Sequence, residues 1–124
     1  MKVVYICSPY RGTDEERKKN IALAKRLCRK AALDGHVVIC PHLYYPGFLD
    51  DRIEEERQTG LAAGLSLLEL VDEVWVAEGR ISSGMSVEIA KAGELGIPTI
   101  SVCDPQEAEE HLLNALLSGK GKNE

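Results

Sequence analysis

Short apolar runs alternate with longer amphipathic segments along this chain. The short runs lack a clean polar alternation, which is typical of strands covered on both faces. They are residues 3–7, 37–40, 73–77 and 97–102. In the longer segments, apolar residues recur every three or four positions, and this spacing predicts amphipathic helices. The helices are expected at about 14–33, 51–71, 84–95 and 105–117.

The alternation of strand and helix predicts an α/β fold, with a four-stranded parallel sheet and helices on both of its faces. We expect the strand order 2-1-3-4, as in a Rossmann-like or flavodoxin-like three-layer sandwich. Residues 1–118 are predicted to form a single domain and residues 119–124 a frayed tail. Four strands leave two open edges and a small core, so a homodimer or a larger homo-oligomer is expected.

The composition is ordinary for a globular protein, since 44% of the 124 residues are hydrophobic and 28% are charged. The net charge is −5 and there is no basic patch, which argues against a duplex nucleic-acid partner. No apolar run approaches the ~20 residues that a membrane span needs. We therefore expect a soluble, cytoplasmic protein that does not contact membranes.

Four cysteines are spread along the chain, and none belongs to a C-x-x-C pair. They are Cys7, Cys28, Cys40 and Cys103. This spacing does not predict a zinc site or any other metal site. We expect four buried, reduced thiols that act as small apolar side chains.

Two loops are expected at the carboxyl edge of the sheet, where ligands of open parallel sheets bind. Residues 8–12 follow the first predicted strand and residues 78–84 follow the third, and each loop leads into a helix N-terminus that favours an anion. In the first loop, Ser8 lies near Arg11 and Gly12, and an arginine suits bidentate binding of phosphate or carboxylate. The alternative is a surface arginine paired with Asp14 or Glu15.

The second loop is the sharper signal, because it carries hydroxyls and a glycine at a helix start. Residues 82–88 read SSGMSVE, with Ser82, Ser83 and Gly84 at the N-terminus of the helix. Simple N-capping is the alternative explanation. Glu88 lies too far into the helix to complete a capping box, and its spacing from Met85 places both on one apolar face. A carboxylate on such a face needs a partner or a role, so we interpret Glu88 as functional.

The aromatic and imidazole side chains near this edge can be interpreted as structural or as functional. Tyr5 lies in the middle of the first strand, either as a core aromatic residue or with its hydroxyl held near Glu88. His42, Tyr44 and Tyr45 lie in the loop after the second strand, where they either stack on a base or only pack together.

These segments resemble a known superfamily. Residues 5–12 (YICSPYRG) are similar to the first strand and loop of the 2'-deoxynucleoside 5'-phosphate N-hydrolases. Residues 72–78 (DEVWVAE) and 82–88 resemble their second signature, which nucleoside 2-deoxyribosyltransferases share more loosely. With PHLYYPGFLDD at 41–51 included, the resemblance is closest to small bacterial and phage-borne members of this superfamily that have no assigned activity.

The resemblance implies a role for each matching residue. Glu88 matches the carboxylate nucleophile that attacks C1' of the sugar, and Tyr5 matches the tyrosine that hydrogen-bonds near it. Arg11, Ser82 and Gly84 match the contacts to the 5'-phosphate. The deoxyribosyltransferases tend to carry an acid at the position of Ser82, and a hydroxyl there favours a phosphorylated substrate because an acid would repel phosphate.

One position departs from the pattern of the superfamily. Its second carboxylate is expected eight residues before Asp72, and this chain has Gly64 there. Glycosyl transfer with retention needs an acid or base in addition to the nucleophile. Substitutes within this chain would be Asp50, Asp51, Glu54 or His42, and a neighbouring subunit is the other possible source.

Two functions follow from these residues. The first is an enzyme that cleaves or exchanges the N-glycosidic bond of a nucleotide or nucleoside and requires no metal or redox cofactor. The second is a binding module that holds a nucleotide in the same cleft without catalysis. An oligomeric structural protein with an inert cleft is a third alternative.

Overall fold

The computed structural model describes residues 1–122 and contains one parallel sheet. Its strands are β1 (Val3–Cys7), β2 (Val37–Ile39), β3 (Glu73–Ala77) and β4 (Thr99–Val102). The strand order is β2-β1-β3-β4, and every pairing is parallel. Tyr5 of β1 lies opposite Ile39 on one side and Val74 on the other. The predicted fold class and strand order are therefore confirmed.

Four α-helices connect and extend the strands. They are α1 (Asp14–Leu33), α2 (Glu54–Leu67), α3 (Ser83–Glu94) and α4 (Pro105–Lys122). The second helix is shorter than predicted at both ends, because residues 51–53 form a turn and Leu68–Leu70 tighten into a 3-10 turn. The fourth helix continues beyond its predicted end near Leu117. It includes most of the predicted tail, while residues 123–124 lie outside the described part of the chain.

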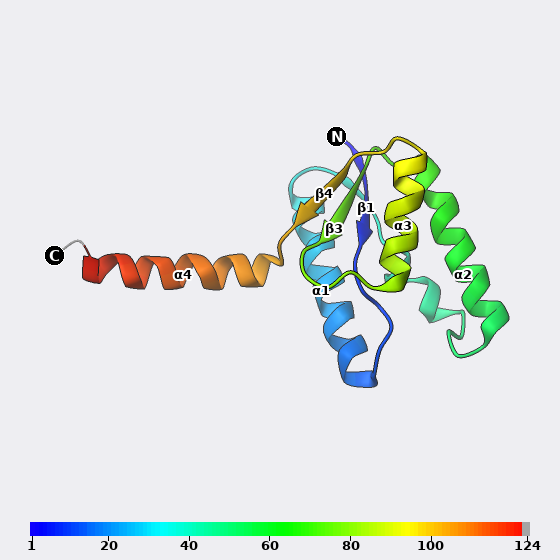
Figure 1. Cartoon of the computed structure of the whole chain (residues 1–124), viewed down its shortest axis with the longest axis horizontal. Coiled ribbons are helices and arrows are strands. Elements are labelled where there is room, and N and C mark those ends of the chain that lie inside the picture. The colour runs from blue at the N-terminus through cyan, green and yellow to red at the C-terminus, as the bar shows by residue number, and fades with distance from the viewer. Residues whose placement is uncertain (123–124) are drawn as a thin grey trace.

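The helices form one layer on each side of the sheet. Helix α1 lies on one face, and α2 and α3 lie on the other (Figure 1). The core therefore has two halves. Val4, Ile6 and Trp75 pack against α1, whereas Tyr5 and Cys7 belong to the half that faces α2 and α3.

Local sequence explains where α1 begins. The Thr13 hydroxyl accepts a hydrogen bond from the Glu16 amide at 3.2 Å, and the Glu16 carboxylate accepts one from the Thr13 amide at 3.0 Å. This capping box satisfies amide groups that a helix start leaves free. A Cβ at Gly12 would lie 2.8 Å from Cβ of Glu16, so the capping box explains why position 12 is a glycine.

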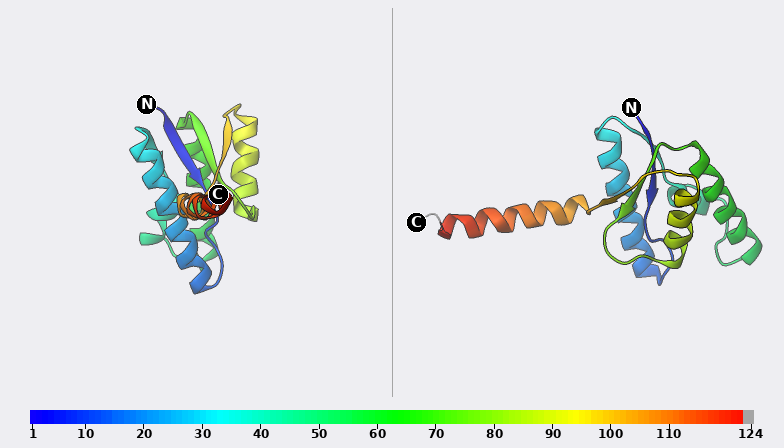
Figure 2. Two further views of the ribbon diagram at one scale, coloured as in Figure 1. Left: turned by 90° about the vertical axis from the view of Figure 1, so that its left-hand side faces the viewer. Right: turned by 45° about the horizontal axis from the view of Figure 1, so that its top comes forward.

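The fourth helix does not cover the sheet. It begins at the end of β4, beside α1, and extends away from the rest of the domain (Figure 2). Two consequences are visible at this side of the molecule. Ile100 of β4 is 41% exposed. Cys103 is exposed and Cys28 is only partly buried, so the prediction of four buried cysteines holds for Cys7 and Cys40 alone. Within residues 1–122, no helix combines the length and apolar character that crossing a membrane requires.

Candidate active site

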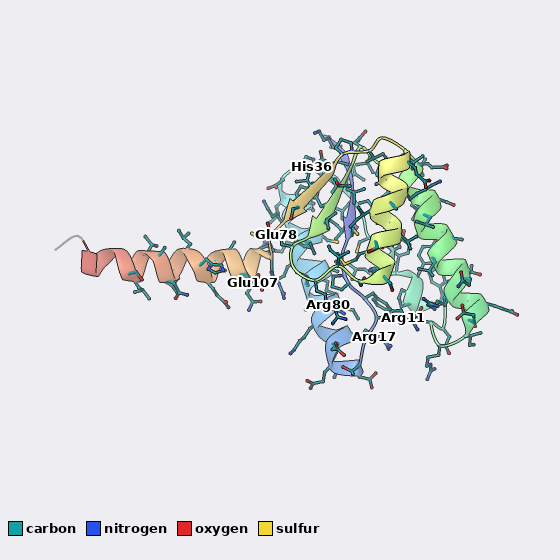
Figure 3. The ribbon with its side chains drawn as sticks, in the orientation of Figure 1. Arg11, Arg17, His36, Glu78, Arg80 and Glu107 are labelled. Carbon is teal, nitrogen blue, oxygen red and sulfur yellow. The ribbon has the colours of Figure 1, made fainter. Side chains whose placement is uncertain are left out.

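The carboxyl ends of the strands meet at one edge of the domain, where the loops after β1, β2 and β3 lie. Arg11 and Arg17, after β1, lie near this edge together with Arg80 from the loop after β3 (Figure 3). Proximity of Arg80 to Glu16 contributes to lowering the pKa of that carboxyl, after the hydrogen bonds from Thr13. The first turn of α3 contains no acidic residue, whereas the first turn of α1 contains three. The start of α3 is therefore the better anion site of the two.

Glu88 is buried on the inner face of α3. Only 8% of the residue is exposed, and Met85 and Ala92 of the same helix are buried with it. No Lys, Arg or His of the described residues forms a salt bridge with Glu88 within 4.0 Å. Burial raises the pKa of Glu88 to about 7, because it penalises the charged form. The carboxyl group can therefore gain or lose a proton near neutral pH.

Tyr5 is the polar partner of Glu88. Its side chain is buried in β1, and its hydroxyl forms a hydrogen bond with the Glu88 carboxyl. This bond favours the ionised carboxylate and partly offsets the effect of burial on the pKa of Glu88. Burial and the nearby Glu88 both raise the pKa of Tyr5, so the phenol keeps its proton and remains a donor.

Gly64 lies against this pair from α2. A Cβ at position 64 would lie 3.1 Å from the Tyr5 hydroxyl oxygen. Position 64, where a second carboxylate is expected from the sequence, is thus directly beside Tyr5. In this chain, the absence of a side chain leaves room for the Tyr5 hydroxyl.

The thiols near Glu88 are not nucleophiles at neutral pH. Burial and, to a smaller extent, the Glu88 carboxylate raise the pKa of Cys7. A hydrogen bond with Cys28 and burial raise the pKa of Cys40 further above its usual value. Both groups remain protonated and fill apolar space, as expected for structural cysteines.

Ser82 caps α3 in an unusual way. Its hydroxyl accepts a hydrogen bond from the Met85 amide at 3.2 Å, and the Met85 sulfur lies 3.5 Å from the Ser82 amide. A methionine thus completes the reciprocal contacts of the cap, and Glu88 has no part in it. A Cβ at Gly84 would find its nearest neighbour, the Ser82 hydroxyl oxygen, at 4.0 Å, so packing alone does not require a glycine there. Ser83 is exposed at the same helix start.

Ser8 and Arg11 differ sharply in their surroundings. Ser8 is fully buried at the end of β1, and its hydroxyl oxygen has no hydrogen-bond partner among the described residues. A buried hydroxyl without a partner is costly, so this atom is a candidate ligand contact. Arg11 is exposed and pairs with Asp51 at 3.2 Å, so its partner comes from the loop after β2 instead of from Asp14 or Glu15.

Asp50 and Asp51 line a hollow of about 510 Å³ beside this edge. Its other lining residues are Tyr10, Asp14, Arg17, Arg52, Glu56 and the segment 46–49. Asp50 is held by Arg52 at 3.0 Å. Glu88, Tyr5 and His42 do not line this hollow. The structure thus separates the sequence candidates into a buried pair and a group of charged loop residues.

His42 packs against Tyr10 with 5.1 Å between the ring centroids. Its Nδ1 atom is buried without a hydrogen-bond partner among the described residues, and burial lowers the pKa of His42. Tyr44 and Tyr45 pack against each other at 4.9 Å, and Phe48 extends this cluster. These aromatic residues therefore contact one another, with Tyr44 partly exposed.

Arg17 and Arg80 were not among the site residues predicted from the sequence. The Arg17 guanidinium lies 5.8 Å from the centroid of the Tyr10 ring, and its buried Nε atom has no hydrogen-bond partner among residues 1–122. Arg80 lies in the same loop as Ser82. A search for every arginine in the loops at the carboxyl edge would have found Arg80. In the part of the chain that the structure describes, no three His, Cys, Asp or Glu side chains are grouped as metal ligands.

Replacing Tyr5 by phenylalanine is expected to raise the pKa of Glu88 above about 7, because the carboxylate loses its stabilising hydrogen bond. The measurement is an NMR titration of the glutamate carboxyl carbons in Tyr5→Phe and in the unmodified protein. Tyr44→Phe removes a hydroxyl from a partly exposed tyrosine and serves as the control. An unchanged pKa in Tyr5→Phe would contradict the role of this hydrogen bond.

Comparisons with known proteins agree with this architecture. The model of a family described as a domain of unknown function, DUF7768, matches residues 2–102. No curated protein matches the chain. Among solved structures, the chain is similar to a 2-deoxyribosyltransferase from the psychrotolerant bacterium Bacillus psychrosaccharolyticus, with a TM-score of 0.60 and 20% sequence identity. The match covers 82% of this chain and 72% of that one, and at this identity it shows a shared fold.

The matched segment runs from the residue before β1 to the end of β4, so it includes the whole sheet and both Tyr5 and Glu88. The fourth helix lies outside it. Because the match covers most of the chain, this protein belongs to the DUF7768 family.

Proposed function

We propose that the protein cleaves or transfers the N-glycosidic bond of a nucleotide or nucleoside, with Glu88 as the nucleophile. The observation that carries this proposal is a buried carboxyl group with a pKa of about 7, hydrogen-bonded to Tyr5 and free of any salt bridge in residues 1–122. Architectural carboxylates are normally paired with a cation, and a group with a strongly perturbed pKa near a ligand-binding edge is a functional candidate. The likeness to a 2-deoxyribosyltransferase supports sugar chemistry on this fold.

The proposed reaction proceeds in two steps. An ionised oxygen of Glu88 attacks C1' of the sugar, the C1'–N bond breaks, and its electron pair leaves with the base, which takes up a proton. Water then attacks C1' of the ester and releases the sugar, or a second base does so and completes a transfer. Tyr5 donates its hydrogen bond to Glu88 and orients the carboxylate for the attack.

A 5'-monophosphate is the proposed form of the substrate. The start of α3 offers free amide groups without a nearby acid in its first turn, beside Ser82 and Ser83. Arg80 precedes it in the same loop, and Arg11 lies at the same edge (Figure 3). The partnerless hydroxyl of Ser8 offers one further contact to a substrate oxygen. Together these groups suit a dianion better than a bare 5'-hydroxyl.

The proton for the leaving base does not come from position 64, which is a glycine. The candidate donors are the groups of the loop after β2. Neither His42 nor Asp50 favours its protonated form at neutral pH, because burial lowers the pKa of His42 and hydrogen bonds from Arg52 lower the pKa of Asp50. Asp50 and Asp51 lie in that loop beside the hollow, and each is paired with an arginine.

The test is to incubate the purified protein with deoxynucleoside and ribonucleoside monophosphates and with the matching nucleosides, and to measure free base by chromatography. We expect base release from at least one monophosphate, and faster release than from the corresponding nucleoside. Faster release from the nucleoside would overturn the proposed phosphate contacts while leaving Glu88 as nucleophile.

A non-catalytic nucleotide-binding module is the second candidate. Gly64 favours it, because the residue expected to assist the leaving base is missing while the Tyr5–Glu88 pair remains. Saturable binding of a monophosphate in calorimetry, with no base released from any compound in the panel, would support the module and exclude the enzyme.

A further inference from the structure

The fourth helix carries apolar side chains that the fold leaves uncovered. Leu112, Leu113, Leu116 and Leu117 are each between 56% and 61% exposed. Their spacing of one and four residues places them on one broad side of α4, and Asn114 and His111 lie on the opposite side. A helix of 18 residues is only marginally stable by itself in water, so α4 needs a surface to pack against.

A matching surface is uncovered on the sheet. Ile100 pairs in register with Trp75, which belongs to the core half beside α1, so Ile100 points to the same face. On this face α1 packs mainly against β1 and β2, and Ile100 of β4 remains 41% exposed. We define the β4–α1 face as this uncovered strip and its border on α1. It comprises Leu23, Arg26, Lys30, Ile100 and Val102, and the buried Trp75 lies beneath it.

The chain's own α4 is directed away from this face where the helix starts. The Asp104 carboxylate forms two hydrogen bonds with the Arg26 guanidinium, at 2.8 and 2.7 Å, which fix the chain at the end of β4. Pro105 directly follows Asp104 and disfavours a helical conformation at Asp104. A tight reversal of the chain toward its own sheet would use that conformation. The helix then runs outward from the domain (Figures 1 and 2).

The charges on α4 and α1 indicate which surface α4 binds. The first half of α4 carries Glu107, Glu109 and Glu110, and Glu107 lies where the helix leaves the domain (Figure 3). The β4–α1 face contains Arg26, which pairs with Asp104, and Lys30, which pairs with Asp34, and the exposed Lys25 and Arg29 lie outside the face on the same helix. An acidic, leucine-rich helix therefore complements the positive charge of α1. The same acids would repel an anionic membrane surface, which is the other common target of an amphipathic helix.

We propose that two copies of this chain exchange their α4 helices, so that α4 of each copy packs on the β4–α1 face of the other. The exchange is reciprocal and gives a closed two-fold dimer in which both leucine surfaces and both exposed sheet strips become buried. It completes on each subunit the missing helix layer beside α1.

The first measurement is the mass of the full chain by size-exclusion chromatography with light scattering. We expect twice the 13.6 kDa of one chain. Leu112→Ser combined with Leu116→Ser is expected to weaken dimerisation about 100-fold or more, because two apolar side chains lose their burial. His111→Ser, on the opposite side of α4, is the matched control and should leave the mass unchanged.

Complementation distinguishes exchange from other arrangements. Ile100→Glu damages the acceptor face but keeps α4 intact, whereas the double serine variant damages α4 and keeps the acceptor face. Each variant alone should be monomeric and should retain the circular dichroism spectrum of a folded protein. An equimolar mixture should form a dimer, because it still contains one intact α4 and one intact acceptor face.

Three results would overturn the proposal. A monomeric unmodified chain would mean that α4 folds back on its own subunit or stays free. A dimer that survives Ile100→Glu would mean that α4 pairs with α4 and not with the sheet. Failure of the two folded, monomeric variants to form a dimer when mixed would exclude reciprocal exchange.

Discussion

Replacing Glu88 by glutamine is expected to reduce base release about 1,000-fold or more, because an amide cannot act as the nucleophile at C1'. The side chain keeps nearly the same size and its contact with Tyr5, so the loss would be chemical. The measurement is the rate of free-base release from the best monophosphate of the panel, at saturating substrate.

Glu94→Gln provides the matched control for this variant. Glu94 lies on the same helix but is exposed, and its nearest cation is Lys91 at 4.0 Å. Its substitution should leave the rate unchanged. If Glu88→Gln retained a rate within about tenfold of the unmodified protein, Glu88 would not be the nucleophile, because ester formation has no substitute group at this position.

The same substitution is expected to stabilise the fold above neutral pH. The pKa of Glu88 rises from 4.5 to about 7 on folding, so between these values the native state binds more protons than the unfolded state. The free energy of unfolding of the unmodified protein therefore falls as pH rises from about 4.5 to about 7. Above pH 7, the ionised Glu88 lowers the free energy of unfolding by on the order of 3 kcal/mol. Glutamine has no charge to bury and avoids this cost.

Urea unfolding at pH 5 and at pH 8 measures this effect at one fixed protein concentration. Glu88→Gln and the unmodified protein should differ little at pH 5, and the variant should be the more stable one at pH 8. Equal pH dependence of the two proteins would contradict the buried, titrating carboxyl group. A variant that gains stability and loses activity is typical of a group retained for function at the expense of stability.

The sequence alone predicted the strands and helices, because apolar runs and helical spacing are local properties of the chain, and the strand order followed from the expected Rossmann-like or flavodoxin-like fold class. It also selected Glu88, since a carboxylate on an apolar helix face is visible from a spacing of three residues to Met85. Errors lie at boundaries and ends. Residues 51–53 form a turn before α2, and α4 extends to Lys122 instead of ending near Leu117.

The partners of the charged loop residues required the structure. Arg11 pairs with Asp51, forty positions away in the chain, although Asp14 and Glu15 are closer in sequence. The path of the loop after β2 decides this pairing, and its two 3-10 turns, Pro41–Leu43 and Tyr45–Gly47, give no periodic signal. Gly12 illustrates the same point, because its requirement for glycine comes from the Glu16 side chain that folds back over it.

By itself, the sequence determined the parallel α/β fold and the buried acid on α3, because both follow from the order of apolar and polar residues over a few positions. Three facts required the tertiary structure. Tyr5 of β1 donates a hydrogen bond to this acid, and a Cβ at position 64 of α2 would lie 3.1 Å from the same Tyr5 hydroxyl. The fourth helix extends away from the sheet and does not cover it. Those facts depend on how separate elements pack, and packing is set by contacts between residues far apart in the chain.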